Sequence, residues 1–310
     1  MVKRIILACI VISLSVFGNK LTDSIYWMGS ASSSSVGLAT TAKTNSQDAI
    51  FYNPAGINLN EQSSINLSYT SNYNTDFSNI SYIAKSEFLS FGIGMHLSQS
   101  PDIDQTIFNE EKNQVEIIGQ YRYTYSSLFL SSAFKIPTIS FGHIGSSLHF
   151  HRMSIGNDVL TGKSINIGLI FTPLSIFSIG YMHHNVIPIH LTWQSKNRIP
   201  PTEMTTIHTV KSHGTIGIEF IPIKTSTLRW SLLTDFELDE IESNETNNYS
   251  PLKIGTEIQY NTITIKGGYN YRFMSFGAST KLQKIQFNYS FMIPKETLDN
   301  RHAFGINFFL

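Results

Sequence analysis

The chain has 310 residues and a formal net charge of +0 at pH 7, so its charge indicates neither nucleic acid nor an anionic surface as a partner. Only 14% of the residues are charged, whereas roughly 25% is usual for a soluble protein. Aromatic residues make up 12% of the chain and the mean hydropathy is -0.04, which argues against a bundle of apolar membrane helices. These values are typical of a membrane β-barrel, whose strands have apolar residues facing outward and polar residues facing inward.

Residues 1–18 have the pattern of a cleaved signal peptide for export. Lys3 and Arg4 form a basic start, residues 5–17 form an apolar stretch too short to span a bilayer comfortably, and a plausible cleavage site ends at Gly18. A membrane anchor and a buried core helix are the alternatives. Cys9, the only cysteine, lies inside the apolar stretch, which continues past it and so argues against lipid attachment. The exported chain is therefore expected to have no disulfide and no thiolate metal site.

Residues 19–62 do not alternate in polarity and are rich in small side chains, such as the run Gly-Ser-Ala-Ser-Ser-Ser-Ser at 29–35. Small side chains permit close packing inside a narrow space. Asn53 suits a helix N-cap and Pro54 suits the first helical position, so the sequence predicts a short helical turn that begins there. A surface loop ahead of the first strand is the alternative.

Alternation with a period of two dominates the sequence from residue 63 to residue 310. At positions 88–97, 263–271 and 285–293, apolar residues face one side and mostly small or polar residues face the other. The sequence predicts an all-β fold, a transmembrane antiparallel β-barrel of about fourteen strands, although a soluble sandwich can alternate in the same way. The predicted strands begin near Ser63, Asp76, Glu87, Gln114, Thr138, Lys163, Ser175, Lys211, Ser226, Ser250, Thr262, Phe273, Lys284 and Arg301.

The lengths of the connections support the same fold, because outer-membrane barrels alternate short periplasmic turns with longer external loops. Tight turns are predicted at 85–86, 137, 173–174, 223–224, 261 and 283, and longer connections at 100–113, 156–160, 185–210 and 239–249. Short connections near Asn74 and Phe273 are exceptions. The alternation requires residues 114–136 to form one long strand, and it places both chain ends on the periplasmic side.

The last strand has an apolar residue at every second position up to the end of the chain. These residues are Phe304, Ile306, Phe308 and Leu310. A strand of this kind resembles the insertion signal of outer-membrane barrels, so we expect the barrel-assembly machinery and outer-membrane lipids as partners. An ordinary final strand is the alternative.

Two regions of the sequence resemble the FadL-like outer-membrane transporter superfamily (FadL/TodX), and within it the short PorV-type branch that includes uncharacterised spirochaete barrels. In the first region, the small-residue run, the acidic Asp48-Ala49 step and the box Asn53-Pro54-Ala55-Gly56 carry the resemblance. In the C-terminal third it rests on residues 255–257, 266–269, 275–278, 287–290 and 302–305. Lys266 stands where the family usually has Arg, and Asn288 where it usually has Asp.

The resemblance implies a fourteen-stranded barrel with an N-terminal hatch, or plug, inside it. The expected divisions are a signal peptide at 1–18, the hatch at 19–62 and the transmembrane barrel at 63–310. In the family's characterised transporters, hydrophobic molecules enter from outside, bind in the barrel and leave after the hatch moves, some of them sideways through the wall. The hatch residues that match by motif are Asn53, Pro54, Ala55 and Gly56.

Several charged or ionisable residues on predicted strands are expected to line the lumen. His149 and His151 share a strand face and could bind a metal, but a polar lining is the favoured interpretation. Asp235 and Glu237 share a face and are interpreted as lumen charges paired with Lys or Arg rather than as a catalytic pair. The lumen-facing candidates are His149, His151, Asp235, Glu237, Glu257, Lys266 and Arg272.

The sequence contains no phosphate-binding glycine loop, GxSxG elbow or HExxH pattern, so no enzyme activity, cofactor or metal is predicted. The leading hypothesis is transport of small hydrophobic molecules, such as long-chain fatty acids, across the outer membrane. The expected ligand is then a hydrophobic small molecule. The alternatives are a PorV-like module that binds partner proteins, and a surface adhesin or antigen that uses the loops at 185–210 and 239–249.

Overall fold

The computed structural model describes residues 29–71, 75–109, 112–156, 158–187, 189–194, 208–210, 212–238, 251–295 and 300–310. The predicted signal peptide at 1–18 and residues 19–28 of the predicted hatch lie outside the described residues. The same holds for the predicted loop at 239–249 and for residues 195–207 of the loop at 185–210.

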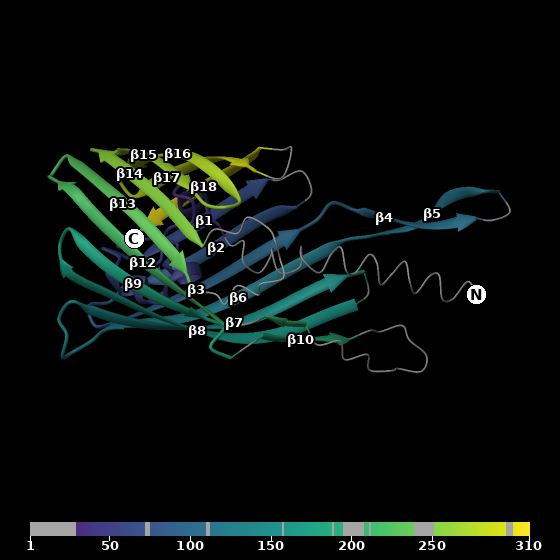
Figure 1. Cartoon of the computed structure of the whole chain (residues 1–310), viewed down its shortest axis with the longest axis horizontal. Helices are drawn as coiled ribbons and strands as arrows, with labels where there is room; N and C mark the ends of the chain where they lie inside the picture. Colours follow the sequence, from purple (N-terminus) through teal and green to yellow (C-terminus); the bar gives the residue numbers. More distant parts are fainter. Residues whose placement is uncertain are drawn as a thin grey trace.

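Fourteen antiparallel strands form a closed barrel, as the sequence predicts (Figure 1). Each strand pairs with the next one in the barrel, and β18 pairs with β1, with Ser64 opposite Phe309. The strands are β1 (Ser64–Ser71), β2 (Asp76–Ala84), β3 (Leu89–Gln99), β6 (Tyr123–Lys135), β7 (Gly142–Ile155), β8 (Asp158–Leu174), β9 (Phe177–His184), β12 (His213–Lys224), β13 (Leu228–Glu237), β14 (Leu252–Tyr260), β15 (Ile263–Tyr269), β16 (Phe273–Leu282), β17 (Ile285–Pro294) and β18 (Arg301–Phe309).

The strands alternate between buried inward residues, mostly polar or small, and exposed apolar outward residues. In β3, Phe91, Ile93 and Met95 are exposed, whereas Ser90 and His96 are fully buried. In β18, Phe304 is exposed and Ala303 is fully buried. Because side chains on a strand alternate between its two faces, a sequence with a period of two gives a barrel that is apolar outside and largely polar inside.

Short turns join the strands at one end of the barrel. At the other end, here called the long-connection end, the connections from β3 to β6, β9 to β12, β13 to β14 and β17 to β18 are longer, whereas those from β1 to β2, β7 to β8 and β15 to β16 are short. The short turns join β2 to β3, β6 to β7, β8 to β9, β12 to β13, β14 to β15 and β16 to β17, close to the positions predicted from the sequence. Asn261 and Gln283 in two of these turns have φ of 51° and 53°, a left-handed conformation that Asn adopts more readily than most residues. The first residue of β1, Ser64, and the last residue of β18, Phe309, both lie at the short-turn end of the barrel.

Two predictions about strand boundaries are wrong. Residues 114–136 do not form one strand, because the chain breaks at Arg122 into β5 (Gln114–Tyr121) and β6. β5 pairs only with β4 (Ile103–Asn109), and this hairpin extends beyond the barrel, since β3 ends at Gln99 and offers no partner above it (Figure 1). The long connection predicted at 156–160 is a tight turn in which Gly156 has φ of 57°, and residues 158–162 extend β8.

A further pair of strands lies at the long-connection end. β10 (Ile189–Gln194) pairs with β11 (His208–Val210) and with the start of β8, while the second half of β8 pairs with β9. Ile189 and Val210 are buried against Tyr125, Met153 and Leu160, three inward-facing residues of the barrel wall. We name these five residues the upper apolar cluster.

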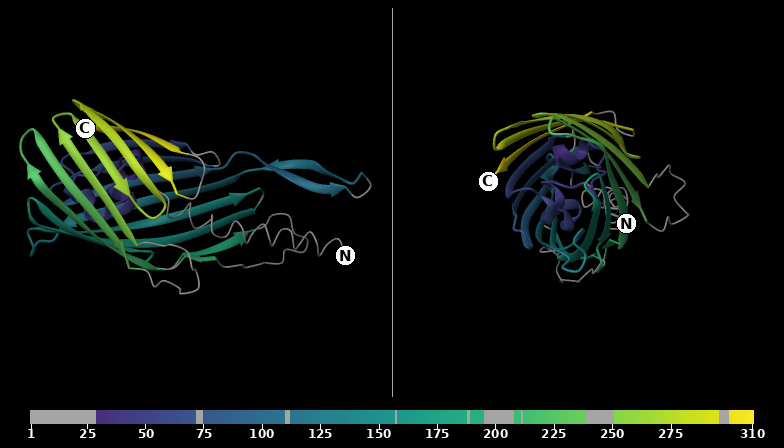
Figure 2. Two further views of the ribbon diagram at one scale, coloured as in Figure 1. Left: turned by 45° about the horizontal axis from the view of Figure 1, so that its top comes forward. Right: turned by 90° about the vertical axis from the view of Figure 1, so that its left-hand side faces the viewer.

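Residues 29–62, here called the N-terminal segment, lie inside the barrel. The right-hand view of Figure 2 shows this purple segment surrounded by strands. It contains α2 (Ala31–Ser34), α3 (Ala49–Tyr52) and the 3-10 helix η1 (Pro54–Leu59). The helical turn predicted at Asn53 and Pro54 is confirmed, and because Pro54 to Asn58 are buried, the alternative of a surface loop is wrong. No helix in the described parts of the chain is long and apolar enough to cross a membrane.

Candidate functional site

The inner wall is shaped to receive the backbone of the N-terminal segment. A Cβ atom on Gly168 would lie 1.9 Å from Asn53 Oδ1, and one on Gly268 would lie 2.0 Å from the backbone nitrogen of Gly37. Glycine is the residue that permits such a close approach between backbones. Inward-facing glycines at which a Cβ would contact backbone or side-chain atoms of the segment occur round the barrel at Gly92, Gly94, Gly145, Gly168, Gly180, Gly217, Gly255, Gly268, Gly277 and Gly305.

Asp235 on β13 holds the middle of the segment. Its Oδ2 atom accepts hydrogen bonds from the backbone nitrogens of Thr40 and Thr41, at 2.9 and 3.0 Å, and from Thr41 Oγ1 at 2.8 Å. Asp235 is fully buried. A carboxylate that accepts several hydrogen bonds fixes the backbone of these residues against the wall, because breaking the contacts would leave buried polar groups unpaired.

Glu219 on β12 holds the next part of the segment in the same way. Glu219 Oε2 accepts hydrogen bonds from Thr44, through the backbone nitrogen at 2.8 Å and Oγ1 at 2.7 Å. Its other oxygen, Oε1, accepts a hydrogen bond from Arg229 Nη2 at 2.9 Å. Glu219 was not among the residues predicted from the sequence to line the lumen. Its position on the inward face, between the outward residues Ile218 and Phe220, is the signal that could have found it.

Glu257 and Lys266 from the predicted set form a charged cluster with the segment. Lys43 Nζ of the segment lies 2.6 Å from Glu257 Oε1 of β14, and Lys266 Nζ of β15 lies 3.4 Å from the same oxygen. Lys266 Nζ also donates a hydrogen bond to Ser32 Oγ at 2.8 Å. One carboxylate therefore joins a cation of the segment to a cation of the wall.

The box residue Asn53 links two parts of the segment to the barrel. Asn53 Nδ2 donates to the carbonyl oxygen of Thr41 at 2.7 Å and lies 3.3 and 3.4 Å from the carbonyl oxygens of Leu169 on β8 and Tyr181 on β9. Asn53 Oδ1 accepts a hydrogen bond from the backbone nitrogen of Ala55 at 3.1 Å. An amide can donate and accept at once, which explains why asparagine suits this position.

Two more polar residues of the segment have buried partners. Asp48 accepts hydrogen bonds from Ser30 Oγ and, at 3.2 Å, from Asn66 Nδ2 of β1. Burial raises the pKa of Asp48, and the hydrogen bond from Ser30 opposes that rise. Asn58 donates to Ser90 Oγ at 3.0 Å, and its Oδ1 lies 2.9 Å from His143 Nδ1. Neither Asp48 nor Asn58 stood out as a contact residue in the sequence.

The other predicted lumen residues lie on the wall away from these contacts. His151 hydrogen-bonds with Tyr125 OH at 2.8 Å and Ser164 Oγ at 3.0 Å, and His149 hydrogen-bonds with Ser147 Oγ at 2.9 Å. Over the residues that the structure describes, no group of three or more His, Cys, Asp or Glu is placed to hold a metal ion.

Glu237 and Arg272 lie towards the long-connection end of the barrel. Glu237, at the end of β13, pairs with Lys253 Nζ at 2.5 Å. Arg272 lies in the connection from β15 to β16, where its guanidinium stacks on the Tyr271 ring at 5.0 Å. The structure thus brings Asp235, Glu257 and Lys266 to the segment and places the remaining predicted charges elsewhere on the barrel.

Comparisons with known proteins match the fold. The toluene transporter TbuX of Ralstonia pickettii is similar with a TM-score of 0.61 and 12% identity, over 91% of this chain and 98% of that one. The toluene transporter TodX of Pseudomonas putida has a TM-score of 0.58 and 12% identity, over 90% and 96%. A FadL homologue of Pseudomonas aeruginosa has a TM-score of 0.52 and 10% identity, over 87% and 95%.

The chain therefore has a FadL-like fold, as the resemblance in the sequence implied. No family model and no curated protein matches it. The resemblance to the PorV-type branch stays a prediction.

Proposed function

We propose that the protein is an outer-membrane channel for small hydrophobic molecules and that the N-terminal segment is its hatch. The observation that carries this proposal is a segment seated inside a closed barrel and held there by non-covalent contacts to acidic residues of the inner wall, chiefly Asp235, Glu219 and Glu257. Two similar structures are described as toluene transporters, which supports the same substrate class for this chain. Transport rather than catalysis is the proposed activity.

The outer surface of the barrel supports the proposed membrane location. Outward residues of its strands are apolar over most of their length, for example Ile80 in β2, Ile258 in β14 and Phe276 in β16, all of which are exposed. An apolar band round a closed barrel is the arrangement that lipid requires, because every backbone group is paired between strands. The short-turn end is proposed to face the periplasm and the long-connection end to face outside.

The energetics of the contacts indicate how the hatch moves. A hydrogen bond to a charged group contributes about 1.5–3 kcal/mol, so withdrawing the whole segment would break contacts worth far more than a small ligand supplies. We therefore propose a local shift of part of the segment, with the remaining contacts kept. Because the upper apolar cluster lies inside the barrel at the long-connection end, it is the proposed first binding place for an incoming molecule.

A disulfide between the hatch and the wall tests this proposal. A Cβ on Gly305 would lie 3.3 Å from Ala31 Cβ, close to the roughly 3.5–4.5 Å found in disulfides. The variant carries Ala31→Cys and Gly305→Cys, with Cys9→Ser to remove the native thiol. Uptake of radiolabelled toluene and of a radiolabelled long-chain fatty acid is measured in bacteria that lack their own fatty-acid channel.

We expect uptake to be lost in the oxidised variant and restored by a reductant, while each single-cysteine variant transports normally in both states. Equal uptake with and without the reductant would contradict a transport movement of the part of the hatch that contains Ala31. The two labelled compounds separate aromatic hydrocarbons from fatty acids as the substrate.

A second function, binding of a partner protein, is favoured by the hairpin of β4 and β5. This hairpin extends beyond the barrel (Figure 2). It exposes apolar residues on both of its faces. Its exposed apolar residues are Ile107, Phe108, Val115, Ile117 and Ile118. Adjacent exposed apolar residues on a two-stranded sheet are unusual on a free surface and typical of a protein-binding surface, which fits the PorV-like alternative.

A further inference from the structure

Outward-facing charges on the barrel strands are concentrated at one place. On the outward positions of the described barrel strands, the charged residues are Asp76, Arg152 and Lys163. Asp76 is the first residue of β2, at the rim of the barrel. Arg152 on β7 and Lys163 on β8 lie within two neighbouring strands, and both are exposed. A general girdle of interfacial cations would be spread round the barrel, so this pair calls for a local explanation.

The register of β6, β7 and β8 places the two cations at the edge of the apolar band. Lys163 lies opposite Phe150, and its Nζ is 5.7 Å from the centre of the Phe150 ring. Arg152 lies opposite Thr161, one step nearer the long-connection end. On the side towards the short turns, the next outward residues are Leu148 and Ile165, whereas above the pair they are Ser154 and Val159. The cations are therefore at the level of lipid headgroups in the leaflet that we propose to be external.

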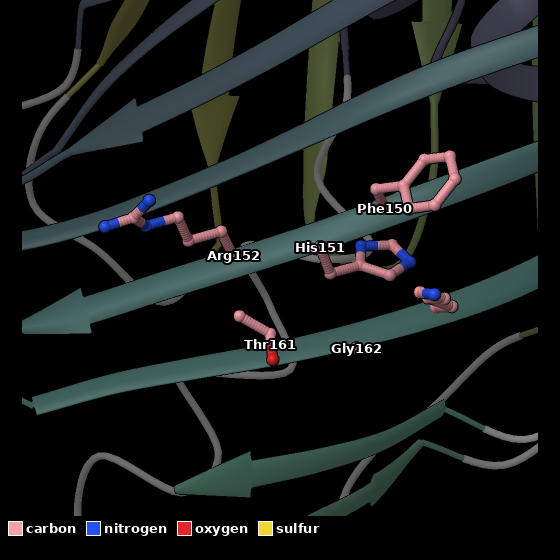
Figure 3. Close-up of a pocket in the computed structure, with 6 residues that line it drawn as sticks. Phe150, His151, Arg152, Thr161 and Gly162 are labelled. Carbon is pink, nitrogen blue, oxygen red and sulfur yellow. The ribbon is translucent and has the colours of Figure 1, made fainter. Parts of the chain in front are cut away.

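A cavity of ≈ 430 Å³ lies at this pair of strands. Figure 3 shows Phe150 and Arg152 extending from one strand and Thr161 from its neighbour. Its lining residues are Phe150, His151, Arg152, Thr161, Gly162 and Lys163, and four of them have outward-facing side chains. The volume is in the range of pockets that hold small ligands, and the lining combines two cations, a hydroxyl and an aromatic ring.

Among the described residues, none neutralises the charges of this site. Neither Arg152 nor Lys163 forms an ion pair with any residue in the described part of the chain. The outward positions of β6, β7 and β8 contain no carboxylate. Two exposed cations without a counter-charge, next to a cavity and above an apolar surface, suit an anionic group attached to acyl chains.

We propose that Arg152 and Lys163 bind the phosphate of an anionic lipid in the leaflet at the long-connection end, with its acyl chains lying on the apolar residues below. The planar guanidinium of Arg152 can donate two parallel hydrogen bonds to the phosphate, and the Lys163 ammonium supplies a second charge. Leu148 and Ile165 form the apolar surface directly beneath the headgroup. This site rests on the proposed membrane location but not on the transport activity.

Native mass spectrometry of the full chain released from lipid nanodiscs tests the site. The nanodiscs contain phosphatidylcholine with a small fraction of phosphatidic acid that has the same acyl chains. We expect phosphatidic acid to remain bound to the wild type and its retention to fall on the order of tenfold in the double variant Arg152→Gln, Lys163→Gln. Arg152→Lys combined with Lys163→Arg keeps both charges and should retain the lipid.

The matched control is Lys112→Gln combined with Arg122→Gln. It removes one Lys from the tip and one Arg from the base of the projecting hairpin, and it should bind like the wild type. Equal retention of phosphatidic acid in the Arg152, Lys163 double variant would overturn the proposal, as would displacement of the lipid by millimolar inorganic phosphate, which would make free phosphate the ligand. Normal insertion into nanodiscs without selective binding would reject this site alone. Failure to insert would reject both the site and the proposed membrane location.

Discussion

Asp235 shows how one inward-facing residue can connect the barrel to the N-terminal segment. Its carboxylate accepts hydrogen bonds from Thr40 and Thr41, far away in sequence, and it has no access to water that could replace them. Gly217, which lies opposite Asp235 in the neighbouring strand, leaves the room that Thr41 occupies. The buried acceptor Asp235 lies beside a glycine, Gly217, that has no side chain to exclude Thr41. This combination makes the contact specific for this part of the segment.

Replacing Asp235 by Ala should loosen the N-terminal segment, the proposed hatch, without preventing barrel formation. The buried nitrogens of Thr40 and Thr41 would lose their acceptor, which costs about 1–3 kcal/mol for each unpaired group. We expect increased entry of a large antibiotic into cells, measured as a lower inhibitory concentration. Glu237→Ala is the control, because Glu237 is on the same face of β13 and pairs with Lys253 instead. Equal sensitivity of the two variants would contradict this role of Asp235.

Replacing Gly268 by Leu should displace the segment by steric conflict. A side chain at this position would meet the backbone of Val36 and Gly37, which cannot move independently of the segment. We expect a protease added to the purified barrel to cleave the segment faster than in the wild type. Gly267→Leu is the control on the same strand, because this neighbour faces outward and its Cβ would be 3.7 Å from the nearest atom, Thr256 Cγ2. Similar protection of the segment in both variants would contradict the close fit.

Predictions from the sequence were most successful where a property belongs to one residue and its neighbours. The cap at Asn53 and Pro54 is of this kind, because it depends on residues within one helical turn. The partners of Asp235, Glu219 and Asn58 could not be predicted, because they depend on which residues of the segment face which strands. A single sequence contains the period of each strand but not the position of the segment inside the barrel.

At the scale of elements, the alternation of polarity and the connection lengths predicted the barrel. The exact strand boundaries depend on which strands pair with each other. The strand number followed from the period of two and from the order of short and long connections. The break at Arg122 could not be predicted from the alternation, because the alternation continues through residues 114–121. These residues pair with β4, whereas the residues after Arg122 pair with the barrel strand β3. The start of β8 was missed for a similar reason, since Gly156 suggested a loop and proved to be part of a tight turn.

Removing the hairpin separates the two proposed functions. Replacing residues 103–121 by a short Gly-Ser linker removes β4 and β5, which form a sheet of their own and pair with no barrel strand. We expect uptake of hydrophobic compounds to continue, since the barrel and its contacts with the N-terminal segment are unchanged. If the protein-binding function is correct, proteins that co-purify with the wild type after crosslinking at the cell surface should be lost. Loss of uptake in a correctly inserted variant would contradict the assignment of transport to the barrel alone.

At the scale of the whole molecule, the barrel has an apolar outer surface and an inner surface that is polar and glycine-rich. The outer surface suits lipid, and the inner surface suits the backbone of the segment. The FadL-like fold follows from these two surfaces together with the fourteen-stranded closure. The substrate does not follow from them, because it depends on the shape of the path that we propose to open when part of the segment moves.

The apolar outer surface gives a direct prediction of membrane embedding. Ile80 in the middle of β2 is exposed, and changing it to Lys should destabilise the barrel in lipid vesicles by about 2–4 kcal/mol, the range for a cation near the midplane. The stability is measured from reversible unfolding by guanidinium. Ile107→Lys in the projecting hairpin is the matched control and should have little effect. Equal stability of both variants would contradict a lipid-facing position for β2.

The most direct test of the hatch is the conductance of single barrels in a planar lipid bilayer. The wild type should show a low conductance, because the segment occupies the lumen, whereas a variant that lacks residues 19–62 should show large and stable open channels. The characteristic shift of a folded barrel on a gel without heating confirms that the shortened protein has assembled. An open channel in the wild type, or equal conductance in both proteins, would contradict the account.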